Sequence, residues 1–246
     1  MDRLIYSSLA AMRGAMARQA TTANNLANVN TSGFRAEMAA VRPLWIQGQG
    51  LQSRATTAEE VVNADMKEGT VAQTGRALDV ALDGDAMLAV QADNGDEAYT
   101  RRGDLQISDS GLLTTGDGTP VLSDTGPITL PPVDRVSVDR DGTIWIVPQG
   151  GDANAPQAAD RLKLVTPAGS RIAKGLDGLF RAAAGGTLPA DPDARLTSES
   201  LEGSNVNASQ MLIEMIDASR AWETQVKMLS TAQDLDRSSA DLMRLD

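Results

Sequence analysis

The residues best suited to chemistry in this chain are clustered aspartates, and their pattern points to turns rather than to a site. Asp79, Asp83 and Asp85 carry the carboxylate oxygens that Ca²⁺ prefers. Asp83 precedes Gly84, however, and this pair is typical of a tight hairpin turn. No alternating loop of acidic residues closed by a glutamate follows, so the sequence predicts a turn here and no metal site.

Two residue types are absent, and their absence removes whole classes of catalysis. The chain has no histidine and no cysteine, which excludes Ser-His-Asp triads, imidazole and thiolate metal ligands, and disulfides. No phosphate-binding Gly-rich loop and no nucleophile elbow occurs. A carboxylate pair for cell-wall glycoside hydrolysis stays open among 33 acidic residues, although 3% aromatic residues are few for a sugar cleft. We therefore predict a protein that is not an enzyme and has no catalytic residue, no cofactor and no metal.

The charge of the chain limits its partners. A net charge of −11 argues against binding to nucleic acid, and no apolar run approaches the roughly 18 residues that a membrane span requires. Residues 1–42 hold five arginines against two acids, whereas residues 199–246 hold nine acids against four bases. Opposite signs at the two ends suit ends that lie together. The first residues also fail as a secretory signal, because Asp2 stands in the region that should be positive.

What remains is the chemistry of association, and it begins in the N-terminal region. From about residue 4 to residue 30, positions spaced by four and three predict a helix with a coiled-coil seam whose one polar member is Gln19. An amphipathic helix folded onto its own domain fits the same spacing. Asn28, Asn30 and Gly33 are expected to end the helix. The seam consists of Ile5, Leu9, Met12, Met16, Gln19, Ala23 and Leu26.

The C-terminal region repeats this spacing for longer. A helix from about residue 205 to residue 245, capped by Ser204 or Asn205, would be roughly 60 Å long and would need partners along its length. Its methionines suit a promiscuous peptide groove, but packing at an interface is the simpler interpretation. The seam consists of Met211, Met215, Ala218, Trp222, Gln225, Leu229 and Ala232, and Met228, Leu235 and Leu242 form a second line at intervals of seven.

Between the two helices the pattern changes to short β-strands. The segments "LDVAL" and "LKLV" are expected strands, and the arginines Arg35, Arg101 and Arg102 are expected to be solvated or paired surface groups. The fold class is therefore α+β, with terminal helices packed as a coiled-coil-like inner domain and a central, mainly antiparallel β domain. The hairpin-type pairs are Asp83-Gly84, Asn94-Gly95, Asp117-Gly118 and Asp141-Gly142. The expected domains are the N-terminal helix (1–36), a connector (37–64), the β domain (65–198) and the C-terminal helix (199–246).

Four motifs, in order along the chain, resemble the bacterial flagellar axial proteins, the family of rod and hook subunits. Leu105 and Trp222 stand where the family has Phe and an aromatic Tyr or Phe, and Asp85-Ala86-Met87 replaces its usual Gly-x-Phe. The opening residues and the modest length are most similar to proximal-rod members, with distal-rod members as the nearest alternative. The motifs are "ANNLANVNTSGF" (23–34), "TGRALDVALDGDAML" (74–88), "YTRRGDLQISDSGLLTTGDGTPVL" (99–122) and "EGSNVNASQMLIEMIDASRAWETQVKML" (202–229).

The resemblance implies a structural role in the basal body. Such subunits leave the cell through the flagellar type III export apparatus without a cleaved signal and join other rod subunits in a tube that crosses the periplasm. The terminal helices would form the inner tube and the β domain would lie outside it. No nucleic acid and no membrane insertion is expected. Peptidoglycan hydrolysis would be the rival role.

The residues that would carry assembly lie on the two helices. We expect these helices to be largely disordered in the free chain and to fold on docking, because an isolated helix gains little in water. The amides of Asn24, Asn25 and Asn28 are expected to form hydrogen bonds between subunits. The expected assembly residues are Ile5, Leu9, Met12, Met16, Asn24, Asn25, Leu26, Asn28, Met211, Met215, Trp222 and Leu229.

Overall fold

Two structural units make up the chain, and each is described by itself. The computed structural model describes residues 2–45, 55–152 and 154–243. The first unit comprises Met1–Val29, Glu37–Asn63 and Val206–Asp246, and the second comprises Asn30–Ala36 and Ala64–Asn205. The segment expected to be a connector (37–64) therefore falls mostly in the first unit, where it contains two strands.

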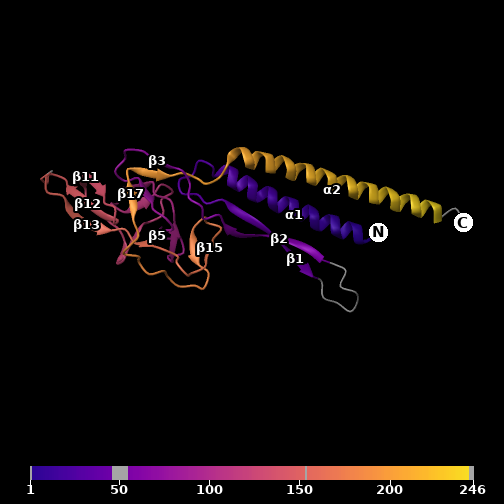
Figure 1. Ribbon diagram of the computed structural model, residues 1–246, viewed down its shortest axis with the longest axis horizontal. Helices are drawn as coiled ribbons and strands as arrows, with labels where there is room; N and C mark the ends of the chain where they lie inside the picture. The colour runs from indigo at the N-terminus through magenta and orange to yellow at the C-terminus, as the bar shows by residue number, and fades with distance from the viewer. Residues whose placement is uncertain (1, 46–54, 153, 244–246) are drawn as a thin grey trace. The chain divides into compact units, whose positions relative to one another are not determined.

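The first unit is built on two helices that lie side by side and run antiparallel (Figure 1). Helix α1 spans Asp2–Ala27, and helix α2 spans Ala208–Met243, a stretch that contains no glycine. With 36 residues, α2 is about 54 Å long. Strands β1 (Glu37–Trp45) and β2 (Ala55–Ala64) pair as a two-stranded sheet, and β1 contacts α1.

The ends of the helices follow from their capping residues. After Ala27, the amide of Asn28 still donates to the carbonyls of Asn24 and Asn25, and Gly33 then takes a positive φ of 65°. At the start of α2, the Asn207 side chain accepts a hydrogen bond from the amide of Gln210 at 3.2 Å. The predicted caps, Ser204 and Asn205, were wrong by two or three residues, because strand β18 runs to Glu202 and the Asn205 amide is used elsewhere.

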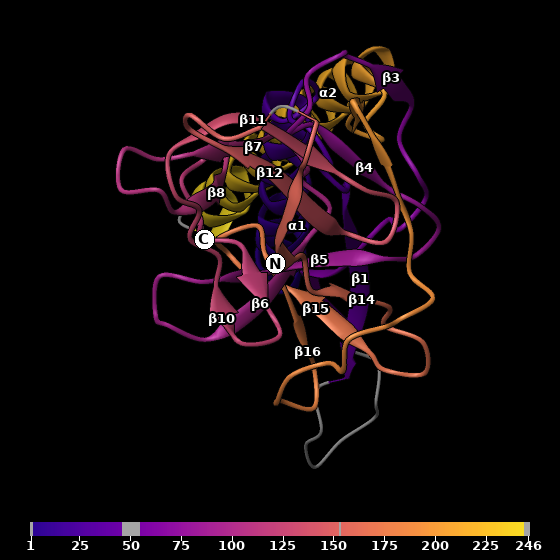
Figure 2. The ribbon, with the colours of Figure 1, turned by 90° about the vertical axis from the view of Figure 1, so that its left-hand side faces the viewer.

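The second unit consists of short antiparallel strands in several small sheets (Figure 2). The five-stranded sheet has the order β14 (Leu164–Val165), β5 (Met87–Gln91), β6 (Glu97–Thr100), β16 (Phe180–Ala182) and β15 (Ile172–Lys174). The three-stranded sheet has the order β11 (Val133–Val138), β12 (Thr143–Pro148) and β13 (Gln157–Arg161). The two-stranded pairs are β17 (Leu196–Ser198) with β4 (Val80–Leu82), β18 (Ser200–Glu202) with β3 (Val71–Gln73), β7 (Leu105–Ile107) with β8 (Leu113–Thr115), and β9 (Leu122–Ser123) with β10 (Gly126–Pro127).

The predicted turn pairs lie at turns. Asn94-Gly95 joins β5 to β6 and Asp141-Gly142 joins β11 to β12, each as a hairpin. Asp117-Gly118 closes a turn in which the amide of Gly118 donates to the carbonyl of Thr115. Asp83-Gly84 is a turn but not a hairpin, since it links β4 to β5, which belong to different sheets. The central antiparallel β region is thus confirmed.

The core of the second unit explains why strand β5 has so few polar residues. Along β5, Leu88 and Val90 point into one apolar cluster, while Met87 and Ala89 point into another. All four side chains have no measurable exposure. A strand buried on both faces reads as a continuous apolar run, as "MLAV" does here. The second unit therefore holds its own apolar core.

Candidate assembly surface

Helix α2 buries one line of residues and exposes the rest of its circumference. Between Ser209 and Leu235, the side chains that are buried or half-buried are those whose positions step by four and three. This is the line that the sequence spacing picks out. Met211, Ala218 and Ala232 are the buried members, and Met215, Trp222, Gln225 and Leu229 are half-buried. The line therefore faces another element of the unit, and α1 contacts α2.

Helix α1 packs through a different line from the one its apolar residues predicted. Its buried side chains include Ser8, Ala15 and Thr22, at intervals of seven and one residue before the predicted seam. Leu9 and Met16 are instead 41% and 56% exposed. Small side chains let neighbouring backbones approach closely, which fits the burial of these residues in place of leucine and methionine. In that predicted seam, Gln19 and Ala23 are also exposed and Met12 and Leu26 are half-buried, while the side chain of Ile5 lies outside the described residues.

Large apolar side chains remain on the open faces of α2. Their exposed fractions run from 43% for Val226 to 61% for Ile213. Met228 and Leu235, the second line seen in the sequence, are 48% and 57% exposed. A surface helix normally carries polar residues opposite its buried stripe, so an apolar surface on both sides of that stripe marks an interaction site. The exposed apolar residues of α2 are Leu212, Ile213, Ile216, Val226, Met228 and Leu235.

The asparagines at the end of α1 have two different roles. Asn25 is buried, and its side chain binds the backbone of Glu37 twice: its Nδ2 donates to the Glu37 carbonyl at 2.9 Å and its Oδ1 accepts from the Glu37 amide at 2.8 Å. This pair of bonds resembles a strand pairing and holds the start of β1 against the end of α1. Asn28 donates to the carbonyl and side-chain oxygens of Asn24. Both hydrogen-bonding ends of the Asn25 amide are therefore used within the chain.

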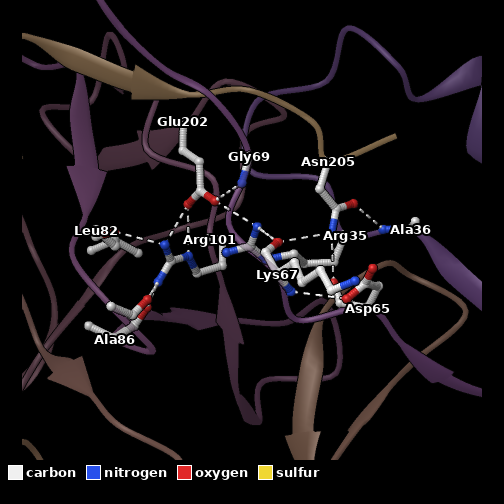
Figure 3. Close-up of polar contacts among 11 residues, drawn as sticks. Arg35, Ala36, Asp65, Lys67, Gly69, Leu82, Ala86, Arg101, Glu202 and Asn205 are labelled. Carbon is white, nitrogen blue, oxygen red and sulfur yellow. Dashed lines mark hydrogen bonds and ion pairs between the residues drawn. The ribbon is translucent and has the colours of Figure 1, made fainter. Parts of the chain in front are cut away.

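The second unit contains a buried ionic cluster that the sequence did not predict (Figure 3). Glu202, at the end of β18, accepts from Arg35 Nη1 and Arg101 Nη2, each at 2.6 Å. Arg35 and Arg101 are 1% and 2% exposed, so the expectation that they lie at the surface was wrong. The pairing could not be predicted from the sequence, because Glu202 lies 167 residues after Arg35 and no local pattern connects the two. Arg102 is half-buried and pairs with Asp104 at 2.7 Å.

The two arginines of this cluster are held to different degrees. Arg101 also donates to the carbonyls of Leu82 and Ala86, at 2.7 and 2.6 Å. Arg35 donates to the carbonyl of Lys67, but its Nε has no hydrogen-bond partner in the described part of the chain. Burial lowers the pKa of the Arg35 guanidinium from its ordinary value, and the neighbouring Glu202 carboxylate opposes that shift. Arg35 thus depends on Glu202 more than Arg101 does.

Asn205 and two glycines complete the cluster. The Asn205 side chain accepts from the amide of Ala36 at 2.7 Å and donates to the carbonyls of Asp65 and Lys67 at 2.8 and 2.9 Å. A Cβ on Gly33 would lie 2.2 Å from the Arg101 carbonyl oxygen. A Cβ on Gly69 would lie 2.0 Å from the Gly203 carbonyl oxygen. Only glycine permits these approaches between backbones.

The aspartates that suggested calcium are occupied by other contacts. Asp79 accepts from the hydroxyl of Thr74 at 2.7 Å and pairs with Arg76, and Asp83 accepts from the hydroxyl of Thr197 at 3.1 Å. Within residues 2–45, 55–152 and 154–243, no three His, Cys, Asp or Glu side chains come together as metal ligands would. The described helices also include none that is long and apolar enough to cross a membrane.

Three protein-family profiles match the chain. "Flagella basal body rod protein" matches residues 5–35 and "Flagellar basal body rod FlgEFG protein C-terminal" matches residues 197–242. Between them, "Flagellar hook protein FlgE/F/G D1 domain" matches residues 81–146. The two rod profiles cover α1 and most of α2, the elements that carry the exposed apolar residues.

Curated relatives match almost the whole chain. The flagellar basal-body rod protein FlgF of Escherichia coli (strain K12) is 41% identical over 240 residues, covering 95% of each chain. FlgF of Salmonella typhimurium is 38% identical over 251 aligned positions, covering 100% of each chain. The flagellar basal-body rod protein FlgG of Bacillus subtilis (strain 168) is 30% identical over 271 positions, covering 99% of this chain and 100% of its own.

Proposed function

Because this chain belongs to the family of flagellar basal-body rod proteins, we propose that its two terminal helices carry the contacts through which rod subunits join. The chain is a structural subunit of the flagellar basal-body rod and not an enzyme, and among its relatives it is most like FlgF. It is located in the flagellar basal body, where it assembles with other rod components.

The observation that carries this proposal is the exposure of large apolar side chains on both helices. Leu9 and Met16 on α1 and Met228 and Leu235 on α2 are each between 41% and 57% exposed. Burying one such side chain contributes on the order of 1.5–3 kcal/mol, offset in part by the entropy of ordering it. A neighbouring subunit that covers these faces supplies the burial that a single chain lacks.

The position of these side chains suits a polymer rather than a closed dimer. The α1 line (Leu9, Met16) and the α2 line (Met228, Leu235) differ in sequence and belong to different helices. When the α1 line of one subunit packs on the α2 line of the next, the contact is heterologous, and such contacts continue into rings or open helical assemblies. We therefore infer a tube of terminal helices that acts as the drive shaft for motility.

Within the rod, we assign the chain to the proximal part. Its identity to the FlgF proteins of Escherichia coli and Salmonella typhimurium is 41% and 38%, against 30% for FlgG of Bacillus subtilis. A distal-rod role of the FlgG kind is the alternative. The family further suggests that the subunit is exported by the flagellar type III apparatus and lies in the part of the rod that crosses the periplasm.

The proposal includes folding on assembly. The buried residues Ser8, Ala15 and Thr22 of α1 are small and bury little apolar area, so α1 gains little stability from contacts within its own unit. We expect both helices to be largely disordered in the free chain and to become ordered when a neighbour covers their open faces. Disorder before docking would keep subunits from polymerising too early.

A pair of aspartate substitutions tests this function. Leu9→Asp and Met228→Asp place a charge on each exposed line, and each is expected to abolish rod assembly and swimming because the charge would be buried at the contact. Lys227→Asp is the control, because it introduces the same side chain at an exposed residue that belongs to neither line and removes no apolar group. Basal bodies purified from cells that carry each variant would be probed for the subunit. Normal assembly of both line variants would refute the proposal.

A further inference from the structure

All four places at which the chain passes between its two units adjoin one cluster of the second unit. The passages lie between residues 29 and 30, 36 and 37, 63 and 64, and 205 and 206. In the second unit, the Gly33 amide donates to the Glu202 carbonyl at 2.8 Å, and the Asp65 amide donates to the Ala36 carbonyl at 2.8 Å. Residues near positions 35, 65 and 202 are therefore bonded to one another here.

The entry segment, residues 30–36, is held chiefly by residues that come much later in the chain. Arg35 pairs with Glu202, and the Ala36 amide donates to the Asn205 side chain. The Asn205 amide in turn donates to the carbonyl of Phe34 at 3.3 Å. Lys174 Nζ lies 3.8 Å from the centre of the Phe34 ring and donates to the Arg35 carbonyl at 3.0 Å. The exit segment, residues 202–205, supplies the Glu202 carboxylate that pairs with Arg35. It also supplies Asn205, which is bonded to both Ala36 and Phe34.

We propose that Glu202 and Asn205 form a closing clasp, in which the exit segment of the second unit fixes the entry segment in place. The closing clasp consists of Arg35, Arg101, Glu202 and Asn205. The entry segment is ordered only after the chain has folded through Asn205, so the first and the last segment of the second unit are fixed in the same step.

The arrangement of charge determines which arginine is released when the Glu202 carboxylate is lost. Glu202 neutralises two guanidinium groups and also accepts from the Gly69 amide at 2.8 Å. Without its carboxylate, Arg101 would lose its ion-pair partner and Arg35 would keep only a weaker attraction to Glu68, so we expect one of these two buried cations to leave. Arg101 keeps the carbonyls of Leu82, Gly84 and Ala86 as acceptors. Arg35 keeps one carbonyl, so loss of the carboxylate releases the entry segment while the strands around Arg101 stay in place.

The clasp has a consequence for assembly, and that consequence rests on the proposed function. In a subunit that is exported with its N-terminus first, the anchor of α1 would stay open until Asn205 has emerged. The clasp itself needs no partner, so it can be measured in the purified chain.

Hydrogen exchange of the purified full-length chain, resolved by peptide, tests the clasp. The variant Glu202→Gln keeps the shape of the side chain and removes its charge. We expect amides of residues 30–36 to exchange on the order of tenfold or more faster, while residues 87–91 of β5 stay as protected as in the parent chain. The control is Glu97→Gln, which makes the same change in the half-buried Glu97–Lys163 pair of the same unit and should leave residues 30–36 unchanged.

The outcomes are distinct. Unchanged protection of residues 30–36 in Glu202→Gln would overturn the clasp, as would an equal loss of protection in the Glu97→Gln control. If Glu202→Gln unfolds the whole unit, the variant Asn205→Ala tests the clasp instead. It removes three hydrogen bonds and leaves no buried charge unpaired. Selective opening of residues 30–36 in Asn205→Ala supports the clasp, and opening of β5 along with them contradicts it. Rod assembly of the Met228→Asp variant is a separate readout, so the two proposals fail independently.

Discussion

The two units of this subunit differ in where their apolar side chains end up. In the second unit, strand β5 buries Met87 and Leu88 on opposite faces, with no measurable exposure of either. In the first unit, Met16, Ile213 and Leu235 are each more than half exposed, although both of its helices are well formed. The second unit completes its core within one chain, whereas the helices of the first unit leave large apolar side chains uncovered.

The difference separates folding from assembly within one molecule. A unit with a closed core is stable alone, and its surface can stay polar. A helix pair with open apolar faces gains its stability from neighbours, so its order depends on the polymer. Sequence changes in the two units should therefore affect different measurements, stability in one and assembly in the other.

A matched truncation of one leucine in each unit gives the largest expected contrast. Leu88→Ala opens a cavity in the core of the second unit and should lower its free energy of unfolding by about 2–5 kcal/mol. Leu235→Ala removes a side chain that is 57% exposed and should change the stability of the free chain by less than about 0.5 kcal/mol. Urea unfolding followed by the fluorescence of Trp145, with Trp45 and Trp222 replaced by phenylalanine, reports on the second unit. Equal effects of the two truncations on the free energy of unfolding would contradict the proposed difference between the two units.

Two glycine substitutions test how closely the backbone segments of the second unit pack. Gly33→Ala combines a φ of 65° with a Cβ placed 2.2 Å from the Arg101 carbonyl oxygen. The substitution should lower the melting temperature of the second unit by an amount equivalent to about 1–3 kcal/mol. Gly75→Ala has a similar φ of 74° but no atom within 4 Å of the new Cβ, so it should cost less. A Gly75→Ala variant that melts as early as Gly33→Ala would show that packing contributes nothing.

The asparagine at the end of α1 provides a smaller test within the first unit. Asn25→Ala removes both hydrogen bonds to the backbone of Glu37, each contributing about 0.5–1.5 kcal/mol. Faster exchange of the Glu37 amide is expected in assembled rods, where the helix is ordered. Asn24→Ala is the matched control, since Asn24 is exposed. If Glu37 exchanged equally fast in both variants, the link between Asn25 and β1 would be refuted.

The smallest expected effect is the acid sensitivity of the β11–β12 hairpin. A hydrogen bond from the Thr143 amide lowers the pKa of Asp141 below its ordinary value, with a further contribution from the Thr143 hydroxyl. Because the folded pKa is the lower one, the stabilisation is fully present above the unfolded pKa of about 3.9 and is lost as the pH falls through the folded pKa. An NMR titration of the Asp141 carboxyl should therefore have a midpoint below that of the same residue in urea. Coincident midpoints would contradict this.

The sequence predicted the elements whose pattern is local. The seam of α2 is the clearest case, because a step of four and three over many turns can face only one side of a helix. The hairpin pairs Asn94-Gly95 and Asp141-Gly142 were equally readable, since two adjacent residues determine the turn. Each of these features is specified within a few residues of itself.

The features that were mispredicted or missed depend on distant parts of the chain. Arg35 and Arg101 carry no local sign of burial, because their partner Glu202 lies 167 and 101 residues later in the chain. In α1, apolar spacing selected Leu9 and Met16, which are exposed in the single chain while Ser8 and Ala15 are buried, so their role at a contact between subunits stays a prediction. Hydrophobicity identifies residues that need burial, but it does not say whether the partner belongs to the same chain.

Hydrogen exchange along the whole chain, compared between the free subunit and the purified rod, separates the two units. Amides of β5 and β6 should be protected in both states, whereas amides of α1 and α2 should exchange rapidly in the free subunit and slowly in the rod. Helices that are as strongly protected as β5 in the free subunit would contradict this prediction.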